Sequence, residues 1–408
     1  MIQTTTAPVR PVNILSREFK ADPFPFYAQL RAEAPVYRTK LPDKRQAWLV
    51  TRYDDVAALL KDDRFAKDRR SVMNPEQLGK QPWLPGFLRP LERNMLDLDD
   101  PDHHRLRTLI HKAFTPRIIE GLRERVQVIA DDLLNAVTPV GHMDVVNDYA
   151  LPLPLTVITE LLGVPSLDQA KFHRWSKTIV QIGSAGSMVK ALPSLFMFMR
   201  YLRKLIETKR ANPEDDLLTA LIQAEEDGDK LSEDELLAMV VLLLIAGHET
   251  TVNLIASGTL ALLEHPEQLE RLRHNPAILK TAVEELLRYA SPVETATERY
   301  AREEIVLHSV TLAKGELVLA VLASANRDEA QFVHPNELEL ARTPNKHLAF
   351  GQGIHFCLGA PLARLEGQLA ISTLLRRLPE LQLGVAPEKL SWRPTFVVRG
   401  LESLPVRF

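Results

Sequence analysis

The segment "HLAFGQGIHFCLGAPLARLE", residues 347–366, is the most informative part of the sequence and contains the only cysteine of the chain, Cys357. Glycines stand on both sides of this cysteine, and glycine lets backbone N–H groups approach a sulfur atom closely enough to donate to it. Pro361 is typical of a first helical turn, so Cys357 is expected near a helix N-terminus. There the helix dipole favours the thiolate, which predicts a lowered thiol pKa.

Three other interpretations of this stretch are weaker. A buried structural cysteine is the ordinary state of a lone thiol, but it does not require the surrounding glycines. The segment "GQGIHF" has Phe356 where a dinucleotide-binding motif needs glycine, and no convincing parallel βαβ pattern surrounds it. A cysteine hydrolase would need a facing base, and His355, two residues away, rarely faces a cysteine productively.

The composition limits the function classes. The chain has 408 residues, of which 45% are hydrophobic and 25% charged, with a formal net charge of −3. This balance argues against a nucleic-acid partner or a membrane-surface binder. A single cysteine excludes an internal disulfide, a cysteine-based zinc finger and a four-thiolate iron–sulfur cluster. We therefore expect a soluble intracellular enzyme in the cytoplasm.

No targeting or membrane segment is visible in the sequence. The first residues lack the basic and apolar regions of a signal peptide. The longest apolar run, from Leu236 to Gly247, is shorter than the roughly 18–20 residues of a spanning helix, so a buried core helix is expected and no membrane anchor.

Helical periodicity dominates the chain, as in residues 215–227, 266–290 and 360–378. Ser232 and Glu235 form a capping box that predicts a long helix reaching about Leu263. Strand patterns are shorter, near 47–53, 304–322 and 394–408. We predict a mainly α fold with a minor β region, built as one domain over residues 1–408, with residues 1–21 peripheral.

The cysteine stretch resembles a known family. Phe350, Gly353, Cys357 and Gly359 fit the pattern F-x-x-G-x-x-x-C-x-G, which is similar to the haem-binding loop of the cytochrome P450 superfamily. The resemblance implies a single helical prism around haem b, with Cys357 as the proximal iron ligand. It also implies haem contacts from Phe350, Gly351 and Gly359.

The apolar helix that follows Ser232 contains a second signature. "AGHETT", residues 246–251, places polar groups inside a helix that is apolar nearly all round, where they need a reason to be buried. It is similar to the family's distal-helix motif, in which Ala246 and Gly247 contact the haem. By this resemblance Glu249 relays protons and Thr250 orders water against bound dioxygen. His248 is expected to pack.

Two further pairs match the family. Glu285 and Arg288, at i and i+3, share a helix face and resemble the family's buried fold-locking pair, for which Arg342 is the expected third partner.

His103 and Arg107 are four residues apart and also share a helix face. In the family, a matching pair holds haem propionates, whose carboxylates need charge-assisted partners. Arg299 and His355 match further propionate-facing positions.

The implied reaction inserts one atom of dioxygen into a substrate by hydroxylation or epoxidation and reduces the other atom to water. No flavin or nicotinamide fingerprint is convincing, so NAD(P)H is expected to act only through partners. We expect a stand-alone bacterial enzyme, a monomer, that receives electrons from a ferredoxin or flavodoxin and its reductase. Lys112, Arg117 and Arg364 are candidates for steering that acidic partner.

The substrate pocket is expected, by family position, to be lined by mostly apolar residues: Met73, Trp83, Leu84, Phe87, Leu88, Val180, Ile182, Leu243, Ala246 and Val293. Such a lining favours a lipophilic molecule of medium or larger size, for which a secondary metabolite is one source. The competing function is a haem-binding sensor or a degenerate recruiting module without turnover, which should lack the cysteine or the acid–alcohol pair.

Overall fold

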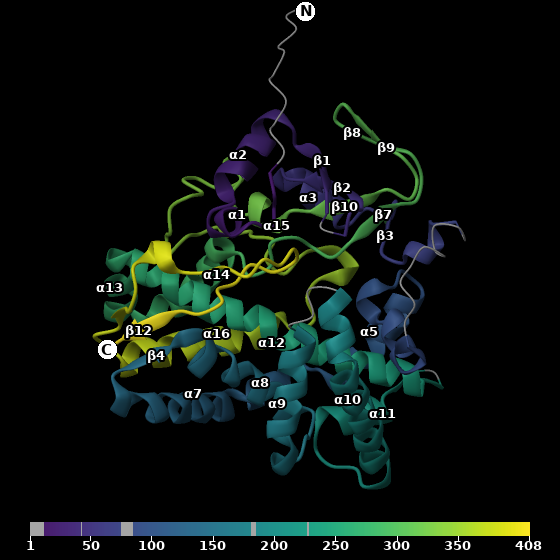
Figure 1. Cartoon of the computed structure of the whole chain (residues 1–408), viewed down its shortest axis with the longest axis horizontal. Coiled ribbons are helices and arrows are strands. Elements are labelled where there is room, and N and C mark those ends of the chain that lie inside the picture. The colour runs from purple at the N-terminus through teal and green to yellow at the C-terminus, as the bar shows by residue number, and fades with distance from the viewer. Residues whose placement is uncertain (1–11, 42, 75–84, 181–184, 227) are drawn as a thin grey trace, which may run out of the picture.

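The computed structural model describes residues 12–408 except residues 42, 75–84, 181–184 and 227. Helices dominate, and a smaller β region lies at the upper end of the view in Figure 1. The predicted mainly α fold with a minor β region is confirmed.

The α-helices are α1 Arg17–Ala21, α2 Phe24–Glu33, α3 Tyr53–Leu59, α5 Asp102–Ala113, α6 Pro116–Gly121, α7 Arg123–Val137, α8 Pro152–Leu161, α9 Ser166–Val180, α10 Ala185–Ala211, α11 Leu217–Gln223, α12 Glu233–Glu264, α13 Pro266–His274, α14 Leu279–Ala290, α15 Leu322–Ala325 and α16 Ala360–Arg377. Short 3-10 segments are η1 Arg69–Ser71, η2 Gly86–Glu92, η3 Met95–Asp97, η4 Thr138–Val140, η6 Pro276–Ile278, η7 Gly353–His355 and η8 Pro387–Lys389, and η5 Val145–Ala150 is a π-helix.

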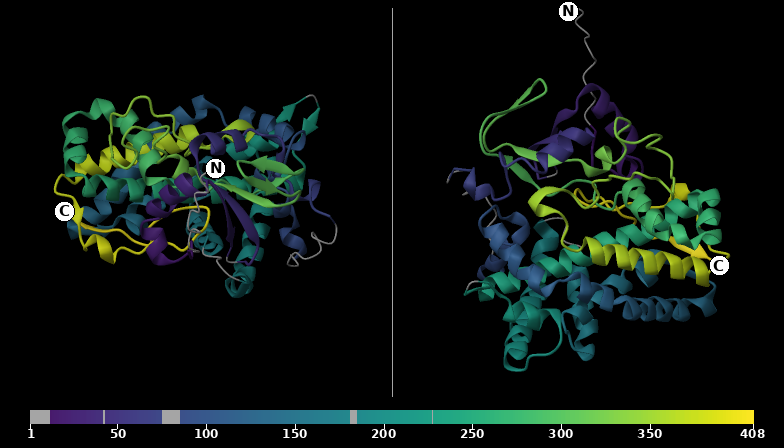
Figure 2. Two further views of the ribbon diagram at one scale, coloured as in Figure 1. Left: turned by 90° about the horizontal axis from the view of Figure 1, so that it is seen from above. Right: turned by 180° about the vertical axis from the view of Figure 1, so that it is seen from behind.

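The strands are β1 Val36–Lys40, β2 Gln46–Val50, β3 Phe65–Ala66, β4 His142–Asp144, β5 Glu225–Glu226, β6 Asp229–Lys230, β7 Arg299–Ala301, β8 Ile305–Leu307, β9 Val310–Leu312, β10 Leu317–Ala320, β11 Gln382–Leu383 and β12 Pro405–Arg407. A five-stranded sheet has the order β1-β2-β10-β7-β3, and a three-stranded sheet has the order β11-β12-β4. The β8–β9 hairpin projects from the larger sheet (Figures 1 and 2).

The strand predictions are confirmed in position and corrected in length. The segment 304–322 is not one strand but three, β8, β9 and β10, because two turns interrupt it. In the segment 394–408, only β12 is a strand, and the remainder contributes isolated bridges such as Val293 to Val398.

Helix α12 lies in the middle of the molecule, packed between α8, α14 and α16 (Figure 1). Its start is the predicted capping box: Ser232 Oγ accepts from the Glu235 N–H at 3.3 Å, and a Glu235 carboxylate oxygen accepts from the Ser232 N–H at 2.8 Å. It ends at Glu264, immediately before His265–Pro266. The helix is long and apolar enough to cross a membrane, but most of its apolar stretch is buried inside the protein, as expected for a core helix.

Helix α16, which follows the cysteine loop, crosses α12 at close range. A Cβ atom added to Gly367 would lie 2.8 Å from Leu254 Cδ2, so the absence of a side chain at this glycine permits the contact. The crossing fixes the start of α16, and therefore the cysteine, relative to α12.

The expectation that residues 1–21 are peripheral is wrong for the part that the structure describes. Ile14, Phe19 and Lys20 are buried. Lys20 Nζ lies 2.5 Å from Glu294 Oε2, and the Tyr27 hydroxyl donates to Glu294 Oε1 at 2.5 Å. A buried charge is stable only when it is paired, and the sequence gives no sign that the partner stands so far along the chain.

Candidate functional site

A cavity of about 270 Å³ lies between α12 and the cysteine loop. Cys357 lines it together with Ala246, Gly247 and Thr250 of α12. The loop and the long helix, identified separately in the sequence, therefore contribute to one site. Most of the exposed lining is apolar.

The conformation of the cysteine loop depends on its glycines. Gly353 has φ +75°, and a Cβ atom there would lie 2.5 Å from the Leu60 carbonyl oxygen, so both the conformation and the space require glycine. Gly351 also has a positive φ, +68°. The Cys357 N–H donates to the Phe350 carbonyl at 3.0 Å, which closes the loop. Helix α16 begins three residues after the cysteine, as expected from Pro361.

The pKa expectation for this thiol is wrong. Burial raises the pKa of Cys357 above its ordinary value, although the N–H groups of Gly359 and Ala360 and the guanidinium of Arg107 act in the opposite direction. Cys357 is exposed where it lines the cavity, but the protein around it still makes a thiolate costly to desolvate, and this cost outweighs the helix N-terminus.

The four predicted anion-binding residues come together at one edge of the cavity. The rings of His103 and His355 have centroids 4.2 Å apart. Arg107 Nη2 donates to the Phe356 carbonyl at 2.7 Å, and Arg299 is buried with one long contact to the Thr297 carbonyl.

These basic groups have few acidic partners among the described residues. His103 Nδ1 lies 3.4 Å from Asp100, outside good hydrogen-bond geometry, and the Nε2 atoms of His103 and His355 are buried without a partner. Burial, with the neighbouring His103 and other cations, lowers the pKa of His355 to about 2, and burial lowers that of Arg299 to about 10. Such a cluster is suited to bind an anionic group in the cavity.

The polar motif of α12 is satisfied mainly within the helix. The Thr250 hydroxyl donates to the Ala246 carbonyl at 3.0 Å, and His248 Nδ1 lies 2.6 Å from the Leu244 carbonyl oxygen. His248 is buried, as expected for a packing residue. Glu249 lies 3.5 Å from Arg393 Nη1, and burial raises the pKa of Glu249 despite this arginine.

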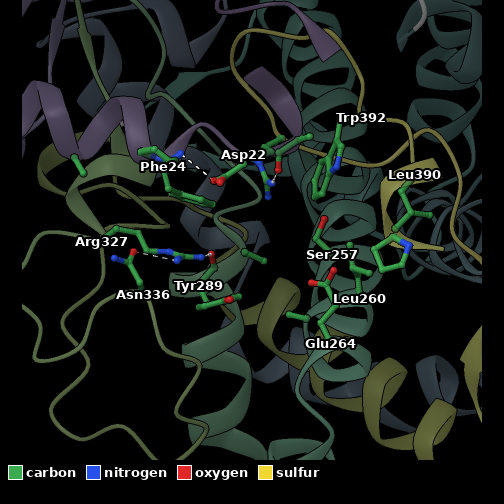
Figure 3. A pocket seen from close by; sticks show the side chains of 17 residues that line it. Asp22, Phe24, Ser257, Leu260, Glu264, Tyr289, Arg327, Asn336, Leu390 and Trp392 are labelled. Carbon is green, nitrogen blue, oxygen red and sulfur yellow. Dashed lines mark hydrogen bonds between the residues drawn. The ribbon is translucent and has the colours of Figure 1, made fainter. Parts of the chain in front are cut away.

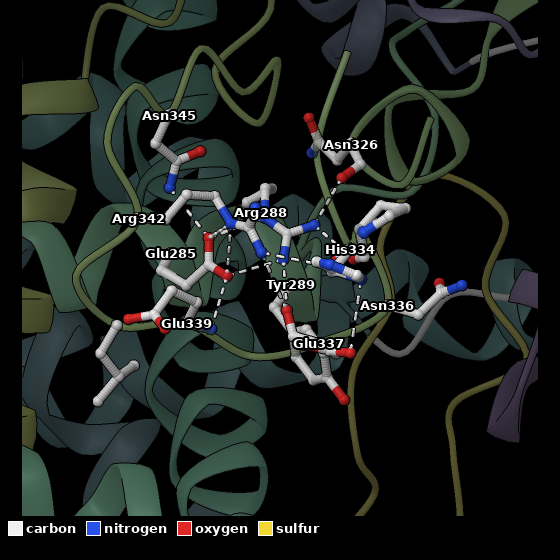
Figure 4. A network of polar contacts seen from close by, with 12 residues as sticks. Glu285, Arg288, Tyr289, Asn326, His334, Asn336, Glu337, Glu339, Arg342 and Asn345 are labelled. Carbon is white, nitrogen blue, oxygen red and sulfur yellow. Dashed lines mark hydrogen bonds and ion pairs between the residues drawn. The ribbon is translucent and has the colours of Figure 1, made fainter. Parts of the chain in front are cut away.

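The predicted ionic lock is present (Figure 4). Glu285 and Arg288 are fully buried and form two hydrogen bonds of 2.7 Å. Arg342 Nε lies 3.1 Å from both oxygens of Glu285. Arg288 also donates to the carbonyls of Asn326, Pro335 and Glu337, which ties the loop before the cysteine stretch to α14.

Only some of the predicted pocket residues line this cavity. Leu243, Ala246 and Val293 do. Leu88 lines an adjacent cavity, Phe87 makes an edge-to-face contact with Phe196, and Met73 packs against the N-terminal core. These three placements differ from the expectation because the neighbours of each side chain are set by tertiary packing. Trp83, Leu84 and Ile182 lie outside the described residues, as does the side chain of Val180.

Arg364, the third candidate for steering an acidic partner, is paired within the protein. It forms two hydrogen bonds with Glu284, of 2.7 and 2.8 Å, and its guanidinium lies 4.5 Å from the ring centre of Phe350. These contacts brace the cysteine loop. Lys112 and Arg117 are exposed.

A further cavity of about 550 Å³ lies between α2, the second half of α12 and the C-terminal segment (Figure 3). Arg327 lies between the rings of Phe24 and Tyr289, and Arg399 stacks 3.7 Å from the centre of Trp392. Arg399 also donates to backbone carbonyls of α1, so its charge is used to hold the N-terminal segment.

Two residues that contact the polar motif of α12 were not anticipated. Arg393 is the partner of Glu249, and Glu366 is buried beside the Thr251 side chain, where burial raises its pKa to about 8. Glu366 lies in the quoted stretch and could have been noticed as an acid on the inner face of an amphipathic helix. Nothing local in the sequence singles out Arg393.

Comparisons with known proteins agree with this geometry. The profile of the family "Cytochrome P450" matches residues 8–278 and 276–389. Polyketide biosynthesis cytochrome P450 PksS of Bacillus subtilis (strain 168) is 46% identical over 96% of both chains. Cytochrome P450 monooxygenase PikC of Streptomyces venezuelae is 45% identical, over 99% of this chain and 95% of PikC. The structure of the myxobacterial cytochrome P450 CYP267B1 in complex with myristic acid matches with a TM-score of 0.90 and 43% identity, over 97% of this chain and 98% of that one.

These matches extend over nearly the whole chain. The protein is a haem-thiolate monooxygenase that belongs to the cytochrome P450 family.

Proposed function

We propose that this cavity would hold haem b, that Cys357 Sγ would ligate its iron, and that the enzyme oxidises a lipophilic substrate there. The observation that carries the proposal is that Cys357 and the Ala246–Thr251 segment line the same cavity. The bound haem would supply the activation of dioxygen, with a thiolate ligand that favours O–O cleavage. Coordination would also offset the desolvation that raises the thiol pKa, because a metal-bound thiol is deprotonated.

The basic cluster fits the two carboxylates of a haem. His103, Arg107, Arg299 and His355 would bind the propionates, and the unpartnered Nε2 atoms of the two histidines are available as donors. Gly247 leaves the cavity open along α12, because a Cβ atom there would meet only Ile158, at 3.9 Å.

Glu249 and Thr250 would supply protons. The raised pKa of Glu249 favours a carboxyl that holds a proton near neutral pH, and Arg393 fixes its position. Glu249 is not part of the cavity wall, whereas Thr250 is. The Thr250 hydroxyl would therefore pass the proton into the cavity, while its own bond to Ala246 sets its orientation.

The substrate is proposed to be a lipophilic molecule of medium or larger size. The mainly apolar cavity wall, with Leu243 and Val293, supports this class, as does the myristic acid complex of CYP267B1. A screen of long-chain acids and macrolactones for a change in haem spin state would identify ligands. With labelled dioxygen, a true substrate should gain one labelled oxygen atom. Ligands that change the spin state but are never oxidised would favour the competing function, a haem-based sensor.

The electron donor, the cellular location and the oligomeric state are also proposals. Electrons would come from NAD(P)H through a separate ferredoxin or flavodoxin and its reductase, and the enzyme would act as a cytoplasmic monomer. The retained Glu249–Thr250 pair favours turnover over a recruiting module, because such a module has no use for a proton source.

A further inference from the structure

A cavity of about 470 Å³, called the second cavity below, adjoins the cavity that Cys357 lines, which is called the first. Thr297 lines both cavities, so the two meet at this residue. The wall of the second cavity combines apolar side chains, including Leu88 and Leu195, with several charged ones. Lys67 is one of these, immediately after β3.

Lys67 is an unusual residue for such a position, because its side chain is buried and only 5% exposed. Its Nζ donates to the Thr297 hydroxyl at 2.6 Å and to the Glu298 carbonyl at 2.9 Å. Both acceptors are neutral. Buried lysines are almost always paired with an acid, since an unpaired buried ammonium is costly.

The acids closest to Lys67 have partners of their own. Glu298 forms two hydrogen bonds with Arg45 and accepts one from Tyr300. Asp99 pairs with Arg302 at 2.8 Å and accepts the backbone N–H of Lys67 at 2.7 Å. Within the described part of the chain, no carboxylate forms an ion pair with the Lys67 ammonium.

The surroundings of Lys67 carry charges of both signs. Burial, and then the charge of Arg299, lower the pKa of Lys67 to about 7, while Asp97, Glu298 and Asp99 act in the opposite direction. Asp97 also has a partner of its own, because it accepts a hydrogen bond from Asn94 Nδ2 at 2.6 Å. Lys67 is in turn among the cations that depress the pKa of His355, after burial and His103. The ammonium therefore adds positive charge beside Arg299 and His355, at the edge of the cavity that Cys357 lines.

We propose that Lys67 binds a carboxylate at the junction of the two cavities, and that this carboxylate is a haem propionate. The inference rests on the proposed haem site. Because Lys67 lies close to Arg299 and His355, which are proposed to bind the propionates, a propionate is the favoured source of the carboxylate. A substrate carboxylate arriving through the second cavity has the same chemistry, and the experiment separates the two.

The test compares three variants of the haem-loaded protein. Lys67→Gln removes the charge and keeps a donor toward Thr297, Lys67→Arg keeps the charge, and Lys40→Met is a control at an exposed lysine on β1. The first measurement is the rate of haem transfer to apomyoglobin. We expect Lys67→Gln to release haem on the order of tenfold faster, because a charge-assisted contact is lost, while Lys67→Arg and Lys40→Met stay near the wild type.

The second measurement is the affinity for myristate and for tetradecan-1-ol, from the spin-state change. If Lys67 binds a haem propionate, Lys67→Gln should change the affinities for myristate and for tetradecan-1-ol by the same factor. A loss on the order of tenfold for myristate alone, with unchanged haem release, would assign Lys67 to a substrate carboxylate and overturn the propionate assignment. Equal haem release and equal affinities in wild type and Lys67→Gln would overturn carboxylate binding altogether.

Two controls keep the outcome interpretable. The carbon-monoxide spectrum of each reduced variant reports the thiolate ligand, which Lys67 should not affect. A wild-type protein that binds no haem would contradict the proposed function itself, whereas normal spectra with unchanged haem release contradict only the role of Lys67. If Lys67→Gln does not fold, haem release from Lys67→Met decides the same question.

Discussion

At the residue scale, the site combines groups that are unfavourable when considered separately. Cys357 is a thiol whose pKa is raised by burial, Glu249 is an acid with a raised pKa, and Arg299 is a buried guanidinium. A bound metal would stabilise the Cys357 thiolate, a proton would stabilise Glu249, and a bound anion would stabilise Arg299. Cys357 and Arg299 line the cavity and Glu249 lies next to its wall residue Thr250, and such a concentration of perturbed groups is typical of a catalytic site.

The Thr250 hydroxyl is the polar group of the acid–alcohol pair that lines the cavity. We expect Thr250→Ala to retain haem and substrate binding but to yield severalfold less product per NAD(P)H consumed, because proton transfer into the cavity is impaired. Thr250→Ser, which keeps a hydroxyl, should restore most of the coupling. The ratio of product to NAD(P)H, with hydrogen peroxide measured in parallel, checks this, and full coupling in Thr250→Ala would contradict the role.

Glu366 should make stability depend on pH. Its pKa is about 8 in the folded protein, raised by burial from an ordinary 4.5. Between these values the unfolded chain has released a proton that the folded protein keeps, so the free energy of unfolding falls as pH rises, by about 1.4 kcal/mol for each pH unit. Glu366→Gln removes this dependence.

We therefore expect Glu366→Gln to gain stability over the wild type as pH rises from about 5 to about 7.5, by roughly 3 kcal/mol in total. Denaturant unfolding at several pH values measures this difference. A constant difference between the two proteins across that range would show that Glu366 does not stay protonated.

At the element scale, local sequence signals were sufficient where a motif is contiguous. The capping box predicted the start of α12, and Pro361 predicted the start of α16. Glu285 and Arg288 could be paired because they are one helical turn apart. The partners of Lys20 and Glu249 could not be predicted, since Glu294 and Arg393 come from distant segments that only the tertiary fold brings close.

The burial of helix α1 predicts a structural role for the N-terminal segment. Lys20→Met should lower the free energy of unfolding by about 3 kcal/mol, because it leaves Glu294 buried without its cation. The exposed Lys40→Met is the matched control and should have little effect. Thermal or denaturant unfolding of the two variants measures the difference, and equal stabilities would restore the peripheral interpretation.

At the scale of the whole molecule, the sequence predicted the fold class and the central site more reliably than the substrate pocket. The cysteine loop, the long helix and the buried Glu285–Arg288 ion pair can each be identified from residue spacing along the chain. The pocket is not: Leu243 and Val293 face the cavity, whereas Met73 packs elsewhere, because side-chain direction depends on how the surrounding loops fold.

The surface near the cysteine predicts how electrons arrive. Helix α5 contacts the cysteine loop through Arg107, and Lys112 and Arg117 follow on the same stretch of chain. We expect Lys112→Glu combined with Arg117→Glu to slow reduction by an acidic ferredoxin on the order of tenfold at low salt, with a smaller effect at high salt. Lys40→Glu, on the β sheet, is the control, and stopped-flow reduction is the measurement. An unchanged rate at low salt would reject this docking surface.

The proposed role of Cys357 is to ligate a haem iron in the cavity beside α12. The most direct test is the absorption spectrum of the reduced, carbon-monoxide-bound protein, for the wild type and for Cys357→Ser. The wild type should show the shifted Soret band of a thiolate-ligated haem, and Cys357→Ser should lose that band while still folding. A folded, haem-supplemented wild type without the shifted band, or a Cys357→Ser variant that keeps it, would contradict the account.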